Sequence, residues 1–100
     1  MTTIYCITRW NSNNEQTDSK MFMTLEGAAK WLTNLHPIDN QFSVRDHDFN
    51  GNYDITADNL RTILNVQEKQ GFGTYFYIQQ ECVVFLFETR FTLSTIDVED

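Results

Sequence analysis

The chain has 100 residues, about the size of one domain, and its 41% hydrophobic content is enough for one compact core. Its 14 acidic and 7 basic residues give a net charge of -7, which disfavours direct binding to nucleic acid or to anionic membranes. The start of the chain lacks a signal-peptide pattern, and the longest apolar run, residues 82–87, is far below the roughly 20 residues that span a bilayer. We therefore expect a soluble, cytoplasmic, single compact domain over residues 1–100.

Cysteine usage agrees with an intracellular protein. Cys6 and Cys82 each lie in an apolar run, and two cysteines are too few for a secreted disulfide scaffold. We expect buried thiols in a reducing compartment. A single bridge between the first and last long strands is the alternative interpretation.

The first part of the chain predicts a hairpin followed by a helix. Residues 4–10 are β-branched and aromatic on both faces, as in a central strand. Residues 11–19 contain no apolar side chain and predict an exposed polar loop, after which residues 20–23 return as a short strand. Thr24 is typical of a helix N-cap, and apolar residues at helical spacing follow until Pro37 ends the helix.

The second part predicts a strand, a helix and a long hairpin. Residues 42–46 alternate as a short strand, and Thr56 caps a helix that ends at Gly71. Two long strands joined near residues 80–81 follow, with alternate apolar side chains pointing inward. The apolar signal then thins, so residues 94–100 are expected to form a frayed acidic tail.

The predicted fold class is α+β, with a mainly antiparallel sheet of about four to five strands and two helices packed on one face. The order is strand, strand, helix, strand, helix, strand, strand. In the final hairpin, Tyr75 and Tyr77 lie opposite Phe76 and Ile78, so both faces are apolar and the helices cover only one. An assembly protein that forms a homodimer through the other face or an exposed edge is therefore one functional hypothesis.

Residues 46–57 match the first half of an EF-hand calcium loop, with a bidentate Glu required at the twelfth position. Ala57 occupies that position, so the closing carboxylate is missing and we assign no metal. A weaker calcium-binding module is the alternative, with the oxygen-bearing side chains Asp46, Asp48, Asn50 and Asp54 as ligands. The simpler interpretation is an exposed turn, because Asn50-Gly51 is also a strong hairpin-turn signal.

The sequence does not predict an enzyme. His47 lies between Asp46 and Asp48, but adjacent residues of an extended chain point to opposite faces, so these carboxylates do not orient the imidazole. Neither a nucleophile motif nor a phosphate-cradling loop accompanies it. We expect no catalytic residue and no cofactor.

Recognition by charge is the main functional hypothesis. Five acidic residues fall within twenty positions and are opposed there only by Arg45; they are Asp39, Asp46, Asp48, Asp54 and Asp58. Duplex DNA presents about one negative charge per 1.7 Å, so carboxylates at similar spacing compete for a surface that neutralises phosphates. We expect a non-enzymatic binding protein that occupies the basic, nucleic-acid-binding surface of a host protein. The alternative is that the acids only keep the domain in solution.

The layout of residues 4–10, residues 25–32 and the acidic stretch 46–48 resembles the small acidic antirestriction and related host-defence inhibitors of phages and plasmids. The resemblance covers about the first half of the chain. It implies a DNA-mimic type of viral inhibitor that blocks a nucleic-acid-binding surface, as in a restriction or CRISPR-type defence system. Such inhibitors often act as dimers.

Overall fold

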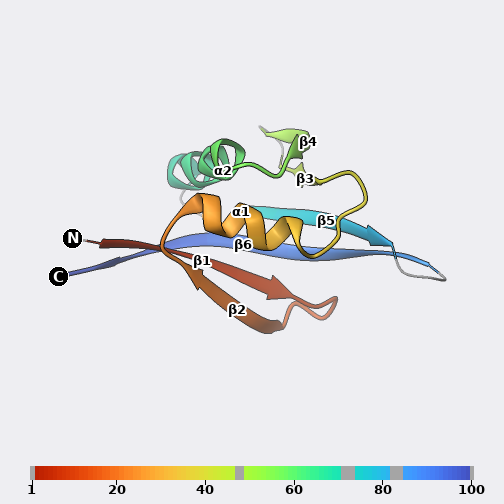
Figure 1. Ribbon diagram of the computed structural model, residues 1–100, viewed down its shortest axis with the longest axis horizontal. Coiled ribbons are helices and arrows are strands. Elements are labelled where there is room, and N and C mark those ends of the chain that lie inside the picture. Colours follow the sequence, from red (N-terminus) through yellow and green to blue (C-terminus); the bar gives the residue numbers. More distant parts are fainter. Residues whose placement is uncertain (1, 47–48, 71–73, 82–84, 100) are drawn as a thin grey trace.

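The architecture is a six-stranded antiparallel sheet, in the strand order β2-β1-β6-β5-β3-β4, with both helices on one face (Figure 1). The computed structural model describes residues 2–46, 49–70, 74–81 and 85–99. The elements are β1 (Thr2–Trp10), β2 (Gln16–Phe22), α1 (Leu25–Thr33), β3 (Gln41–Arg45), β4 (Asn50–Asp54), α2 (Ala57–Gln70), β5 (Tyr75–Glu81) and β6 (Leu86–Val98). The predicted α+β class is confirmed, with six strands in place of four to five.

The core lies between the helices and the covered face of the sheet. Alternate residues of each strand point to that face, and these side chains are almost fully buried, including Ile7, Phe42, Val44, Phe76, Ile78, Phe91 and Leu93. Leu32 of α1 and Leu60 and Ile63 of α2 pack against them without exposed surface. The rings of Phe76 and Phe91 stack with centroids 5.4 Å apart. The middle of the sheet is therefore fixed by aromatic packing on one side only.

Both predicted helix starts are confirmed. The Thr24 hydroxyl accepts a hydrogen bond from the Gly27 amide at 3.0 Å, and the Thr56 hydroxyl accepts one from the Asn59 amide at 3.2 Å. Each bond satisfies an amide that the helix itself leaves unpaired. α1 ends at Thr33, a few residues before Pro37, and α2 continues to Gln70.

The acidic loop, residues 46–54, differs from the prediction because half of it is a strand. Asn50 to Asp54 form β4, which pairs with β3 in the register Arg45↔Asn50 to Gln41↔Asp54. The Phe49 amide donates to the Asp46 carbonyl at 3.3 Å, and Asn50-Gly51 lies in a strand rather than in the predicted turn. Tyr53 explains this register, because its ring stacks on Phe49 at 4.6 Å and packs on Phe42 at 5.8 Å.

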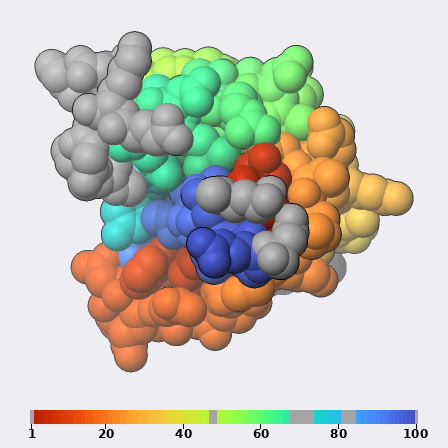
Figure 2. All heavy atoms as spheres, turned by 90° about the vertical axis from the view of Figure 1, so that its left-hand side faces the viewer, coloured from red at the N-terminus to blue at the C-terminus, as the bar shows by residue number. Residues whose placement is uncertain are grey.

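Two other strands extend beyond their predicted boundaries. β2 begins at Gln16, so the second half of the expected loop 11–19 is an exposed edge strand. β6 continues to Val98 and pairs with Thr2 of β1, so the expected frayed tail is wrong for residues 94–98. Backbone pairing holds this segment although its side chains are mostly exposed. Figure 2 shows the two ends of the chain together between α2 and the β1–β2 hairpin.

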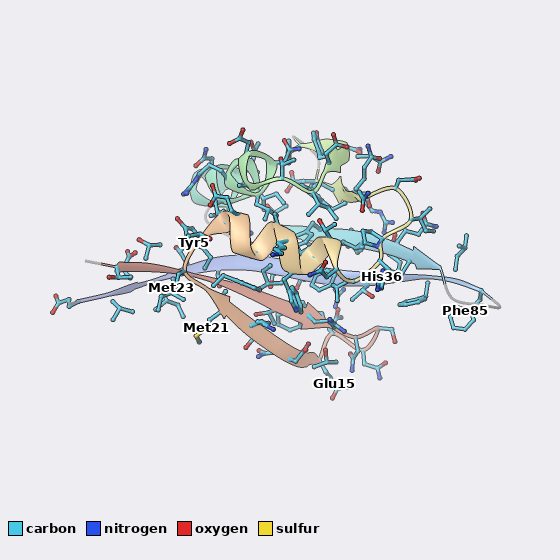
Figure 3. The ribbon with its side chains drawn as sticks, in the orientation of Figure 1. Tyr5, Glu15, Met21, Met23, His36 and Phe85 are labelled. Atoms are coloured by element: carbon cyan, nitrogen blue, oxygen red, sulfur yellow. The ribbon has the colours of Figure 1, made fainter. Side chains whose placement is uncertain are left out.

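The last hairpin is longer than expected. Glu81 pairs with Leu86, so the connection lies at residues 82–85 rather than at 80–81. The predicted alternation puts Phe85 and Phe87 on the same side of the strand as Phe91, but they are 58% and 38% exposed because this end extends beyond the helices (Figure 3). Val83 and Cys82 lie outside the described residues, whereas Cys6 is a buried free thiol as expected.

Candidate functional site

The five predicted carboxylates do not form one cluster. Asp39 is exposed in the connection between α1 and β3, and Asp54 is exposed at the end of β4. Their segments lie together, because the Ile55 amide donates to the Asn40 carbonyl at 3.0 Å. Asp58, in the first turn of α2, lines a separate hollow beside Glu26 and Arg61. The structure therefore brings two of the predicted residues to one sheet edge and separates the third.

The other two predicted acids follow β3 in the sequence. Asp46 is half-buried, and Asp48 lies outside the described residues, as does His47. Every acidic residue with a described side chain, other than Asp46, is exposed. The charge of the chain is thus carried on its outside.

The four-residue calcium set is not assembled. Asn50 and Asp54 stand at opposite ends of β4, about 13 Å apart at 3.3 Å per strand residue, so they cannot reach one ion with 2.3–2.6 Å ligand distances. Asp54 instead accepts a hydrogen bond from the Gln41 side chain at 3.0 Å. Among the described residues, three or more His, Cys, Asp or Glu side chains are nowhere grouped so as to hold a metal.

The sheet face opposite the helices, here called the open face, carries a different chemistry. Its centre, here called the central band, consists of Trp10, Arg45, Tyr75, Tyr77, Glu88 and Arg90. These side chains alternate along their strands with the buried core residues, so they point away from the helices. The band crosses β1, β6, β5 and β3.

Arginine–ring contacts organise the central band. The Arg45 guanidinium lies 4.1 Å from the Tyr77 ring centroid, and the Arg90 guanidinium lies 4.7 Å from that of Tyr75. Trp10 meets Tyr75 edge-on at 6.3 Å and donates from Nε1 to the Thr92 hydroxyl at 2.9 Å. Such contacts hold a cation over the negative face of a ring. They fix the rings and guanidiniums in place, and Arg90 also donates hydrogen bonds to the Asn11 carbonyl, at 3.2 Å, and to the Asn14 side chain in the connection between β1 and β2.

Arg45 also forms an ion pair with Glu88 on the neighbouring strand. The hydrogen bond from this guanidinium to the Glu88 carboxylate raises the pKa of Arg45 above its usual value. The pair is partly exposed, so it contributes positional order more than stability.

Two shallow hollows adjoin on the open face. The larger, of about 420 Å³, is lined by polar side chains that include Gln41, Ser43, Asn52 and Gln79. The smaller, of about 220 Å³, is lined by Trp10 and Arg90. Tyr77 and Glu88 line both, so the hollows form one continuous depression along the central band.

Basic side chains elsewhere also lie against rings. Arg9 lies 5.7 Å and Lys20 5.6 Å from the Trp31 centroid, and Arg61 lies 5.5 Å from that of Tyr5. Arg9 also forms an ion pair with Asp18 at 3.5 Å. With Arg45 and Arg90, five of the seven basic residues contact an aromatic ring in the described structure. Positive charge is thus held at ring faces while most carboxylates point to solvent.

The sequence analysis found the two tyrosines of the central band but not its arginines. Tyr75 and Tyr77 were assigned to the second face of the last hairpin, and alternation with Phe91 would also have assigned Arg90 to it. Arg45 comes from β3, so its contact with Tyr77 depends on the order of strands in the sheet.

The comparisons with known proteins give no further guide to function. No family model, curated protein or solved structure matches this chain. In the ranges that the structure describes, no helix is long and apolar enough to cross a membrane.

Proposed function

We propose that this chain is a non-enzymatic binding protein whose exposed carboxylates engage the basic, nucleic-acid-binding surface of a host protein. The observation that carries the proposal is the unequal placement of the two charge signs. Among the described side chains nine acidic residues are exposed against four basic ones, and of these four Lys20, Arg45 and Arg61 also lie against aromatic rings. A partner approaching from solvent therefore meets a negative field.

A surface that binds nucleic acid is the natural complement to this field. Such a surface neutralises phosphates with Lys and Arg, and carboxylates on a rigid domain replace those phosphates without the flexibility of a nucleic-acid chain. The resemblance of the first half of the chain to phage and plasmid host-defence inhibitors points to the same class of partner. Asp39 and Asp54, at one sheet edge, are the carboxylates that we assign to the contact first, with Asp58 on a neighbouring surface.

The first experiment is a pull-down from host lysate with the chain as bait, followed by a binding titration against the recovered protein at several salt concentrations. We expect a nucleic-acid-binding protein whose affinity for the chain falls steeply with salt, because exposed charges are screened beyond about 8 Å at physiological ionic strength. Duplex DNA should compete for the same surface. Recovery of no nucleic-acid-binding protein would count directly against the proposal.

A charge-matched pair of variants separates a local contact from net charge. Asp39→Lys with Asp54→Lys alters the sheet edge, and Glu15→Lys with Glu99→Lys makes the same charge change at other exposed positions. We expect the first pair to lower affinity by at least 10-fold more than the second. Equal losses of affinity would mean that the partner responds only to the net charge of the chain and not to the position of its carboxylates. The acids would then serve mainly to keep the domain in solution, with only a weak long-range attraction to basic partners.

A further inference from the structure

We propose that the open face is the contact surface between two copies of this chain, related by a twofold axis that crosses the middle of β6. The assigned partner residues Asp39 and Asp54 lie at the β3–β4 end of the same face, but the dimer is tested below without any host partner. It concerns the opposite chemistry, on a surface defined by the central band and by the apolar positions at its two ends. Those end positions are Leu86 at one end, and Ile4, Met21, Ile96 and Val98 at the other.

The residue types of the central band are those that concentrate binding energy in protein interfaces. Tryptophan, tyrosine and arginine are enriched at interface hot spots, because they bury large areas while keeping a polar group satisfied. Tyr75 is 40% exposed although it lies in the centre of the sheet. The accessible surface of the molecule is 6441 Å², against roughly 5,900 Å² for a typical monomer of this mass. The larger accessible surface agrees with a sheet that the helices cover on one face only.

Charge selects a second copy for this face and disfavours contact elsewhere. Two molecules of net charge -7 repel each other through their exposed carboxylates. In the central band, Arg45 and Arg90 outnumber the carboxylate of Glu88, which its own Arg45 already pairs. With Asp54 at the β4 edge, the described side chains of the open face balance two arginines against two carboxylates, so two copies approach with least repulsion open face to open face.

The two ends of β6 match each other under a twofold axis, whereas Glu88 of one copy comes opposite Ile96 of the other. Its outward residues run from apolar Leu86 through Glu88 and Arg90 to small polar residues, and end in apolar residues. Reversing one copy about Thr92, the midpoint of the strand, brings Leu86 of one copy to Val98 of the other. A twofold contact requires such a surface, because the same patch serves both partners.

The area is sufficient for a stable contact. The six strands contain 46 residues in total, and each covers about 16 Å² of sheet from a rise of 3.4 Å and a strand spacing of 4.8 Å. The flat footprint is therefore roughly 750 Å², close to the 800 Å² or so that each partner buries in a stable interface.

Sedimentation equilibrium at micromolar to millimolar concentrations tests the proposal without any partner protein. We expect the wild-type chain to dimerise, and Ile96→Asp to weaken the dimer by at least 10-fold because it puts a carboxylate into an apolar end of the face. Met23→Asp is the matched control. Met23 is 66% exposed and Ile96 is 42% exposed, but Met23 lines the hollow between the helix starts. A wild-type chain that stays monomeric, or equal losses in the two variants, would overturn the proposal.

Cross-linking gives a second readout that does not depend on weakening the dimer. Thr92→Cys puts a thiol near the twofold axis, and Lys30→Cys puts one on α1, which faces away from the contact. Under mild oxidation we expect a disulfide-linked dimer from Thr92→Cys well above the level of wild type and of Lys30→Cys. Equal cross-linking in the three proteins would contradict the assigned face. If the same face instead binds single-stranded nucleic acid, as arginine and aromatic platforms do, added oligonucleotide shifts the sedimentation of the wild type and a second copy does not, and the dimer is rejected.

Discussion

The two faces of the same sheet use aromatic residues in different ways. On the covered face, Phe76 and Phe91 stack beneath the helices and expose no surface. On the open face, the adjacent Tyr75 and Tyr77 each carry a guanidinium over the ring and remain in contact with solvent. One face holds the fold together through packing, and the other displays rings with a polar edge. On β5, Phe76 therefore contributes to stability, whereas its neighbours Tyr75 and Tyr77 are available for recognition. Each role can be tested by a separate substitution.

The largest expected effect is the difference between neighbours on the two faces. Phe76→Ala should lower the free energy of unfolding by about 3–5 kcal/mol, because it empties a fully buried site between Phe42 and Phe91. Tyr77→Ala should cost about 1 kcal/mol, since its ring is only partly buried. Urea unfolding of both variants measures the gap. Similar losses would mean that the open face also holds the fold.

A smaller loss is expected where β4 meets the covered face. Gly51 has a φ of 147° and an added Cβ would lie 3.4 Å from the Tyr53 hydroxyl, so Gly51→Ala strains the backbone. We expect a loss of about 1–2 kcal/mol in the free energy of unfolding. Asn52→Ala, one residue along on the open face, is the control and should cost less than about 0.5 kcal/mol. Thermal melts of the two variants decide whether the edge strand has the register described.

Loss of the N-cap of α1 should lower the free energy of unfolding by about 1 kcal/mol. Thr24→Ala removes the hydroxyl that accepts from the Gly27 amide, and the loss of such a cap typically costs this amount. Thr24→Ser keeps the acceptor and should restore most of the stability in chemical denaturation. If alanine and serine behave alike, the N-cap does not stabilise the layer that covers the core.

The smallest effect is expected from the ion pair on the open face. In a double-mutant cycle with Arg45→Met and Glu88→Gln, the coupling should be about 0–1 kcal/mol and should fall with added salt, because both side chains are partly exposed. The pKa of Arg45 is raised above its unfolded value, so this guanidinium stays charged in both the folded and the unfolded state at neutral pH, and the coupling should not change with pH there. A coupling well above 1 kcal/mol would give the open face a structural role as well.

The sequence predicts the parts of this fold that are coded locally. Thr24 and Thr56 sit directly before amphipathic segments, and their capping geometry needs no distant partner. The run from Cys82 to Phe87 has no turn residue to interrupt its apolar pattern, so the last hairpin connection was misplaced by several residues. β4 was missed because three of its five residues are polar Asn or Asp, and only the packing of Tyr53 reveals the strand.

The candidate surfaces depend on strand order, which the sequence does not contain. The contact between Arg45 and Tyr77 requires β3 to lie beside β5, and the contact between Arg90 and Tyr75 requires the register of β5 with β6. The predicted acids were also separated by the fold, since Asp58 belongs to the start of α2 and Asp54 to an edge strand. Asp54 and Asp58 are therefore close in the sequence but lie on different elements of the fold.

The central claim is that the open face, and no other surface, meets a second copy, and methionine oxidation measured as a function of protein concentration tests it most directly. Met21 and Met23 are 60% and 66% exposed, and Figure 3 shows Met21 pointing from β2 away from the helices. Met23 lines the hollow on the helix side. With rising concentration we expect Met21 to become protected while Met23 continues to oxidise at an unchanged rate. Equal protection of both, or protection of Met23 alone, would contradict the account.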